Sequence, residues 1–370
     1  MSEKIKRHHE PLIHITKRDD LPGWKAWLIR LGAIVIGVLL VGVISVLLTG
    51  NDFASIYETM IRGVFGRFFE GGSPRMVWKY GQDIVILLCL GLAVAPAFKM
   101  KFWNCGAEGQ ALIGGLAAMF CMIQFGGKIP EFLLIPLVIV SSILAGAVWG
   151  MIPAFFKAQW NTNETLFTLM MNYVATQLIA YYVYIVGGGS NVINQVETGA
   201  LPVIGDMDYL LNILIVAALT VAMYFYLKYS KQGYEIAVVG ESQNTARYIG
   251  INVKKVVMRT MMLSGAVCGV AGMLLVSGTD HSINTNTVGG QGFTAIMVAW
   301  LGKFNPFIMA LMSALIVFLK TGVAKVADQN FLNSSFSDIS VGLVILLLVG
   351  CEFFIQYSVR LRRAKKEVEA

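Results

Sequence analysis

Polar side chains and one aromatic ring stand within or near the long apolar runs of this sequence, several of them at glycines that break a run. Where a membrane helix is broken, freed backbone groups and nearby polar side chains can hydrogen-bond a polar solute, and a ring can stack on one. The candidates for lining a solute pathway across the membrane are Glu108, Gln110, Asn172, Asn284, Asn286 and Phe293. Glu108 and Asn172 could equally do no more than cap or bridge helices.

Residues for enzymatic, metal or redox chemistry are missing or scattered. The five cysteines contain no C-x-x-C pair, and three of the four histidines precede the first apolar run; both patterns disfavour a disulfide framework or a metal site. No G-x-x-x-x-G-K-[ST] motif occurs, so this chain has no P-loop with which to bind ATP. Any process driven by ATP would need a partner that binds the nucleotide. We therefore predict no catalytic residue, no metal and no cofactor in this chain.

The composition predicts membrane helices as the elements that position the candidates. Of 370 residues, 56% are apolar and 14% are charged, whereas soluble globular proteins carry roughly 25% charged residues. Because about 20 apolar residues cross the hydrocarbon layer, the runs predict an all-α, polytopic membrane protein with about ten transmembrane helices. The predicted spans are residues 27–48, 78–98, 105–124, 132–156, 164–186, 209–227, 260–278, 289–302, 306–322 and 338–357.

The basic residues predict the orientation of these spans. With the N-terminus inside, the inside segments hold 21 Lys and Arg and the outside segments hold six. This asymmetry follows the positive-inside rule and predicts that both termini are cytoplasmic. The net charge of +7 is thereby accounted for without a nucleic-acid partner. Arg30 and Lys320 lie near the ends of apolar runs and are expected to snorkel.

The same pattern predicts the domain organisation. The first run follows a long stretch of mixed charge without a small-residue cleavage site, so we expect a retained span and not a signal peptide. Residues 1–26 form a cytoplasmic tail and residues 358–370 a basic cytoplasmic tail. The membrane domain covers residues 27–357, and its longest inside loop is 228–259.

Two runs are predicted to be discontinuous half-helices. The apolar piece 293–302 after Gly292 has ten residues, or about 15 Å of helix. The run from Cys105 is opened by Gly106 and is expected to be interrupted at residues 114–115. Short or glycine-broken segments in two halves of a transporter indicate a site near the membrane midplane. Close helix packing through small residues is the alternative.

Segment 49–81 has an apolar stripe at helical spacing, which includes Ile56, Met60 and Val64. It predicts either a helix lying on the outer membrane surface or a packed extracellular loop helix.

The solute predicted from the charges is neutral. Acidic residues fall towards the ends of the predicted spans, whereas ion and proton relays retain charges at the membrane centre. No arginine cluster is present to hold an anion. A hydroxylated or amide-bearing solute fits these runs best.

The middle of the longest inside loop is predicted to be helical. Gly240 and Gly250 bracket about two helical turns, with Glu241 and a capping Ser242 at the N-terminal end, which predicts a short surface helix; a plain solvated connector is the alternative. Residues 240–251 closely resemble the G-E-N-P-x-A-A-x-Y-A-G-I segment in the cytoplasmic coupling loop of bacterial ABC importer permeases. The family is that of branched-chain amino acid, simple sugar and nucleoside permeases.

Three further stretches match that family in order. Residues 104–110 resemble its F-N-I-G-A-E-G-Q motif, residues 163–173 are similar to N-E-V-I-x-T-L-M-L-N-Y, and residues 292–306 resemble G-F-x-G-I-A-V-A-L-L-G-x-x-N-P. The first two motifs look most like the nucleoside and simple-sugar branch, and the I-D-L-S-V-G motif of ribose-like permeases is absent. Gln243 and Thr245 depart from the pattern of the coupling loop.

The resemblance implies a membrane subunit of an ABC importer in the bacterial cell membrane. Its partners would be ATP-binding subunits, a second permease subunit, with a heterodimer favoured over a homodimer, and an external solute-binding protein. The solute would be a nucleoside, whose hydroxyls and base the pathway residues would bind, or else a simple sugar. An ATP-independent secondary carrier explains the helices but not the coupling-like loop. The residues that the resemblance assigns to ATPase coupling are Gly240, Glu241, Asn244, Ala246, Arg247, Tyr248, Ile249 and Gly250.

Overall fold

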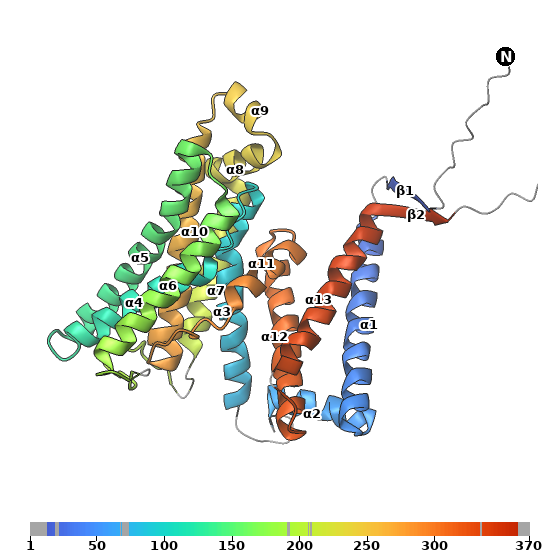
Figure 1. Ribbon diagram of the computed structural model, residues 1–370, viewed down its shortest axis with the longest axis horizontal. Helices are drawn as coiled ribbons and strands as arrows, with labels where there is room; N and C mark the ends of the chain where they lie inside the picture. Colours follow the sequence, from blue (N-terminus) through green and yellow to red (C-terminus); the bar gives the residue numbers. More distant parts are fainter. Residues whose placement is uncertain are drawn as a thin grey trace, which may run out of the picture. The chain divides into compact units, whose positions relative to one another are not determined.

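The computed structural model describes residues 13–18, 22–66, 68, 74–190, 193–205, 207, 209–333 and 335–361. Much of the predicted N-terminal tail, and the basic C-terminal tail from residue 362 onward, lie outside the described residues. The part that is described is almost entirely helical (Figure 1).

Nine helices of the described part are long and apolar enough to cross a membrane. They are α1 (Gly23–Thr49), α3 (Arg75–Lys99), α4 (Ala107–Phe125), α5 (Glu131–Trp160), α6 (Glu164–Val186), α7 (Leu210–Tyr229), α10 (Val253–Leu275, continued by a π-helical turn, Val276–Asp280), α12 (Pro306–Gln329) and α13 (Ser335–Gln356). Each coincides with a predicted run. The tenth run forms α11 (Gln291–Leu301), whose 11 residues are too few to cross a bilayer alone.

A small sheet was missed by the all-α prediction. Strands β1 (Ile13–Lys17) and β2 (Tyr357–Leu361) pair antiparallel, with Lys17 opposite Tyr357. β1 precedes α1 and β2 directly follows α13, so the pairing ties together the segments that flank the first and last long helices. Five residues carry too weak an alternation to predict a strand without its partner, so the sequence alone predicts polar tails at both places.

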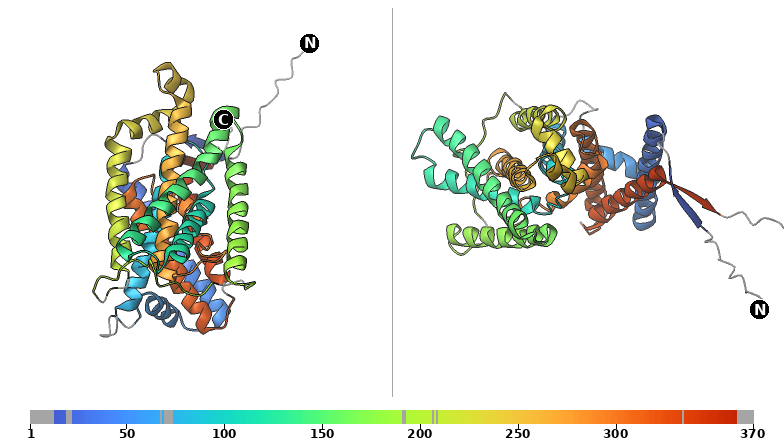
Figure 2. Two further views of the ribbon diagram at one scale, coloured as in Figure 1. Left: turned by 90° about the vertical axis from the view of Figure 1, so that its left-hand side faces the viewer. Right: turned by 90° about the horizontal axis from the view of Figure 1, so that it is seen from above.

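The chain divides into two compact units, here called the central unit (residues 64–318) and the terminal unit (residues up to 63 and from 319 onward). In the central unit α10 packs against α3, α4 and α5. The view from above in Figure 2 shows α10 in the interior of this unit.

Glycines bring α10 very close to α4 and α5. A Cβ atom built on Gly114 of α4 would lie 2.5 Å from Cα of Gly269, and one on Gly150 of α5 would lie 3.0 Å from Cα of Gly265. α4 continues unbroken through residues 114–115. The predicted interruption there is therefore wrong, because these glycines serve close packing, which was the alternative.

One ion pair joins α1 to α13 in the terminal unit. Arg30 Nε donates to Glu352 Oε1 at 2.5 Å, and the two side chains are 9% and 19% exposed. The Arg30 guanidinium also lies 5.3 Å from the Trp27 ring. Snorkelling of Arg30 is therefore a wrong prediction, since a carboxylate on the neighbouring helix neutralises this charge where it lies.

The Glu352→Gln substitution is expected to lower the free energy of unfolding by about 3 kcal/mol, because it leaves the buried Arg30 charge without its counter-ion. Denaturation of the purified chain in detergent, followed by tryptophan fluorescence, measures this change. Asp338→Asn is the control: Asp338 lies 3.9 Å from Lys320 with both side chains exposed, and such pairs contribute below about 1 kcal/mol. Equal effects of the two substitutions would contradict the structural role of Glu352.

Helix α2 (Phe53–Phe65) packs against its own chain. Ile56 and Met60, one turn apart, are 2% and 0% exposed, and a Cβ atom on Gly322 of α12 would lie 3.2 Å from the Met60 side chain. The Tyr57 hydroxyl donates to the Val38 carbonyl at 2.8 Å. The apolar stripe of segment 49–81 is therefore buried against the chain itself, as the packed-loop-helix alternative predicts.

Candidate functional site

Glu108 connects α4 to the short helix α11. The backbone N–H groups of Gly290 and Gly292 each donate to a Glu108 carboxylate oxygen at 2.8 Å. Gly290 is the N-cap of α11, and no acidic residue stands in the first turn of this helix. Glu108 therefore places its negative charge at the positive end of the α11 dipole. A Cβ atom on Gly292 would lie 2.5 Å from the Glu108 nitrogen, so this contact requires glycine.

Asn172 holds the start of α4 against α6. Its Oδ1 accepts from the Gly109 N–H, and its Nδ2 donates to the Cys105 carbonyl, each at 2.9 Å. The side chain is 7% exposed. Both ends of the amide thus bind backbone groups at the opening of α4, which is the bridging role that the sequence left open.

Gln110 lies in a buried polar cluster with Asn104 and Ser264. Gln110 Nε2 donates to Asn104 Oδ1 at 3.1 Å, and Asn104 Nδ2 donates to the Ser264 hydroxyl of α10 at 2.9 Å. Asn104 also accepts from the Gly106 N–H at 3.0 Å. Neither Asn104 nor Ser264 was among the candidates predicted from sequence, although Asn104 stands inside a matched motif. The cluster joins the opening of α4 to α10.

The other three pathway candidates lie on an exposed segment that leads into α11. Asn284 and Asn286 are exposed, and the Asn284 side chain accepts from the Asn286 N–H at 2.7 Å in a local turn. Phe293, in the first turn of α11, is 43% exposed. The candidates thus form two groups. Gln110 and Asn172 are buried around the start of α4, and Asn284, Asn286 and Phe293 are exposed. Glu108 links the two groups through its bonds to the backbone of Gly290 and Gly292.

The loop 228–259, predicted to lie inside, folds into helices α8 (Lys231–Glu241) and α9 (Gln243–Tyr248), which Figure 1 shows at the same end of α10. Ser242 caps α9 by accepting from the Thr245 N–H at 3.2 Å. The Ile251 N–H donates to the Ala246 carbonyl at 2.9 Å and Gly250 has φ +86°, which is a Schellman ending. The predicted short helix is confirmed, except that Gly240 belongs to α8 and does not flank α9.

α9 is anchored by one residue and exposes the others. Ala246 is 0% exposed and lies in an apolar cluster with residues of α3, α5, α8 and α10, whereas Tyr248 and Ile249 are 92% and 51% exposed. The other exposed coupling candidates are Glu241, Asn244, Arg247 and Gly250. Gly240 is buried against the Lys99 carbonyl.

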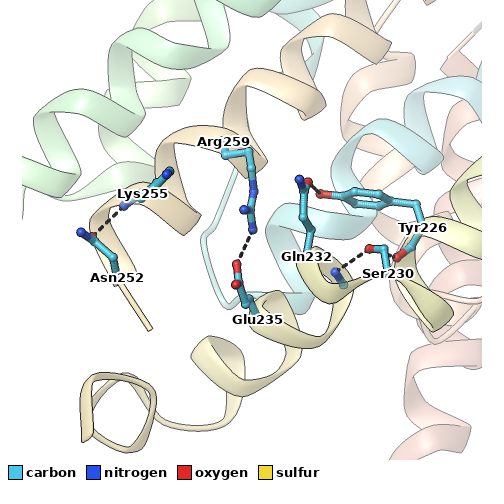
Figure 3. A network of polar contacts seen from close by, with 8 residues as sticks. Tyr226, Ser230, Gln232, Glu235, Asn252, Lys255 and Arg259 are labelled. Atoms are coloured by element: carbon cyan, nitrogen blue, oxygen red, sulfur yellow. Dashed lines mark hydrogen bonds and ion pairs between the residues drawn. The ribbon is translucent and has the colours of Figure 1, made fainter. Parts of the chain in front are cut away.

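An ion pair joins α8 to α10, and polar caps hold the first turn of each helix (Figure 3). Arg259 of α10 donates to Glu235 of α8 at 2.8 Å. The first turns of α8 and α10 are capped by Ser230 and Asn252, which accept N–H bonds at 2.9 and 3.1 Å. The pair of Arg259 and Glu235 could not be predicted from sequence, since a spacing of 24 residues gives no local signal. The ion pair and the apolar cluster make α8 and α9 part of the body of the central unit.

The described residues contain no group of His, Cys, Asp and Glu side chains that could hold a metal ion.

Comparisons with known proteins agree with this architecture. The family model described as branched-chain amino acid transport system, permease component, matches residues 82–349. The chain is 32% identical to the guanosine ABC transporter permease protein NupP of Bacillus subtilis over 339 residues, which cover 87% of this chain and 93% of the relative.

Two further relatives are named as permeases for glucose and for nucleosides. The glucose ABC transporter permease protein TsgB13 of Haloferax volcanii is 27% identical over 94% of this chain and 93% of its own length. The nucleoside ABC transporter permease protein NupB of Lactococcus lactis is 25% identical over 93% of this chain and 96% of its own length. An ABC permease subunit is itself neither catalytic nor dependent on a cofactor, because its ATP-binding partner handles ATP. The chain therefore belongs to the family of permease components of branched-chain amino acid transport systems, as a multi-pass subunit of an ABC importer in the cell membrane.

Proposed function

We propose that this permease imports a nucleoside by alternating access, driven by ATP hydrolysis in its partner subunits. The observation that carries the solute class is the 32% identity to a guanosine permease over 87% of the chain. The predominantly apolar spans, with few charges near their centres, support a neutral solute. A simple sugar is the second candidate, favoured by the glucose permease that is 27% identical over 94% of the chain.

The orientation of the chain is part of this proposal. Paired strands cannot lie on opposite sides of a membrane, so the pairing of β1 with β2 supports placing both ends of the chain on one side. The excess of basic residues in the predicted inside segments favours the cytoplasm as that side. In this orientation α8 and α9 face the ATP-binding subunit. Both ends on one side require an even number of crossings, so α11, a half-helix clamped by Glu108, makes the tenth crossing together with the segment that precedes it.

The complete importer would contain ATP-binding subunits, an external solute-binding protein and a second permease, a different chain being favoured over a second copy. Closure of the ATP-binding subunits would push on α9, and the anchoring of Ala246 would transmit that movement to α3, α5 and α10.

Uptake by the assembled importer in proteoliposomes tests the proposal. With the solute-binding protein outside and ATP inside, labelled guanosine is expected to accumulate, and unlabelled guanosine is expected to compete better than glucose. Accumulation of glucose alone would favour the sugar, and uptake that persists without ATP would overturn ATP-driven import.

The double substitution Tyr248→Ala with Ile249→Ala is expected to weaken binding of the ATP-binding subunit by more than tenfold, because exposed aromatic anchors dominate interface energies. Co-purification from detergent, titrated with the ATP-binding subunit, measures the affinity. Phe331→Ala is the control, since Phe331 is 98% exposed in the loop between α12 and α13, which the proposed topology places outside. Unchanged affinity in the double variant would refute the coupling role of α9.

A further inference from the structure

The exposed face of α6 carries a polar and aromatic stripe. Tyr173, Gln177, Tyr181 and Tyr184 follow one another at intervals of four, four and three residues, which places them on one helix face. The three tyrosines are 69%, 66% and 57% exposed, and Gln177 is exposed as well. Among the described residues Gln177 has no hydrogen-bond partner.

The buried face of α6 determines where this stripe points. Asn172 holds α6 to the start of α4 through two hydrogen bonds of 2.9 Å. Gln177 lies five residues further along the helix, or about 140° around it. The stripe therefore faces away from the central unit. Tyr173 and Gln177 each lie within about 3 Å of the helix midpoint along the axis, well away from the interfacial belts in which tyrosine is common.

The neighbouring helix α5 shows what a lipid-facing surface of this chain looks like. Its exposed stripe consists of Leu137, Val140, Leu144 and Val148, which are 36% to 58% exposed and wholly apolar. An amide left without a partner in hydrocarbon is costly. The contrast between α5 and α6 indicates that the middle of the α6 stripe does not face lipid.

Tight helix packing is also a poor explanation for the stripe. Where helices of the central unit approach closely, as α10 approaches α4 and α5, they do so through glycines, in line with the small residues preferred at such contacts. The exposed residues of α6 are all large: Leu166, Met170, Tyr173, Val174, Gln177, Leu178, Tyr181, Tyr184, Ile185 and Val186. Such a face leaves space between helices.

We infer that Tyr173 and Gln177 line the solute passage, on the side of this chain that faces the second permease subunit. This inference rests on the proposed function, and it names a site outside the original candidates, of which Gln110 and Asn172 are buried and hydrogen-bonded internally. The solute class that fits is uncharged, with a flat ring to stack on Tyr173 and hydroxyl or amide groups to bond the Gln177 amide.

Cysteine accessibility in the assembled importer tests the placement. Tyr173→Cys, Gln177→Cys and the α5 control Leu144→Cys are exposed to a charged, membrane-impermeant thiosulfonate. The unmodified chain gives the background, since four of its five cysteines are buried and Cys105 partly so. We expect positions 173 and 177 to react at least tenfold faster than position 144, and guanosine during ATP turnover to slow both at least threefold.

Two outcomes overturn the inference. Reaction at positions 173 and 177 as slow as at position 144 would place the stripe in lipid or in a closed subunit contact. If the importer transports guanosine but guanosine does not slow the reaction, the two residues do not contact the solute. Guanosine uptake by the unmodified importer is measured in the same preparation, so a failure of the proposed function appears there and leaves the accessibility comparison with Leu144→Cys intact.

A second variant separates solute contact from structure. Gln177→Leu keeps the size of the side chain and removes the amide. It is expected to raise the KM for guanosine at least tenfold while the importer still assembles, and Gln177→Asn is expected to restore part of the loss. An unchanged KM in Gln177→Leu would refute the role of this residue.

Discussion

Replacing Glu108 by alanine is expected to reduce solute uptake by roughly 100-fold while the importer still assembles. The substitution removes two charge-assisted hydrogen bonds to the N-terminus of α11, each 2.8 Å long. Such bonds contribute about 1.5–3 kcal/mol each, so even a combined loss of about 3 kcal/mol would shift the population with α11 docked on α4 by roughly 100-fold.

Hydrogen exchange at residues 290–293 measures the release of α11 directly. Faster exchange there should accompany the loss of uptake, and Glu108→Gln should be intermediate, because an amide has one acceptor oxygen where the carboxylate has two. Glu131→Ala is the control: Glu131 also stands in the first turn of a helix but is exposed. Unaltered exchange in Glu108→Ala would show that the carboxylate does not hold α11.

Replacing Gly269 by leucine is expected to abolish accumulation of folded permease. A Cβ atom at this position would lie 3.0 Å from the Ser142 carbonyl carbon and 3.3 Å from Cα of Ile143. Gly269 also meets Gly114 of α4, so α10 cannot shift away from α5 without striking α4. Backbone atoms have no alternative rotamer, and the penalty should therefore exceed the 1–3 kcal/mol typical of overpacked side chains.

Size-exclusion chromatography of the detergent-extracted protein follows this effect, with Gly342→Leu as the control. Gly342 lies inside α13, and a Cβ atom there would meet nothing within 4 Å. The control should accumulate at the level of the unmodified chain. A monodisperse Gly269→Leu protein in normal yield would contradict the close approach of α4, α5 and α10.

Much of the fold could be predicted from local sequence. Nine of the ten predicted spans are long apolar helices of the described chain, because the thickness of the hydrocarbon layer sets a minimum length for an apolar run. The capping of α9 by Ser242 and its ending at Gly250 were also predictable, because capping depends on residues within one turn of the helix end.

The functional site could be predicted only in outline. The motif around Glu108 and Gln110 marked the right region, but residue type does not say whether a polar group faces a solute or a neighbouring backbone. Asn172 shows this limit, since its amide binds Gly109 and Cys105, residues that lie more than 60 positions away. Gln177, which has no such partner among the described residues, carried no motif and was not selected.

The sequence by itself determined the membrane architecture, the family and the position of the coupling-like loop, because hydropathy, caps and motifs are properties of short stretches of chain. The tertiary structure alone decided the roles of individual glycines and polar residues. Gly114 packs against α10 and does not break α4, Arg30 pairs with Glu352 and does not snorkel, and the polar stripe of α6 stands out only once Asn172 is seen on its buried face. Each of these roles depends on which helix lies opposite, and that is a property of packing between distant segments.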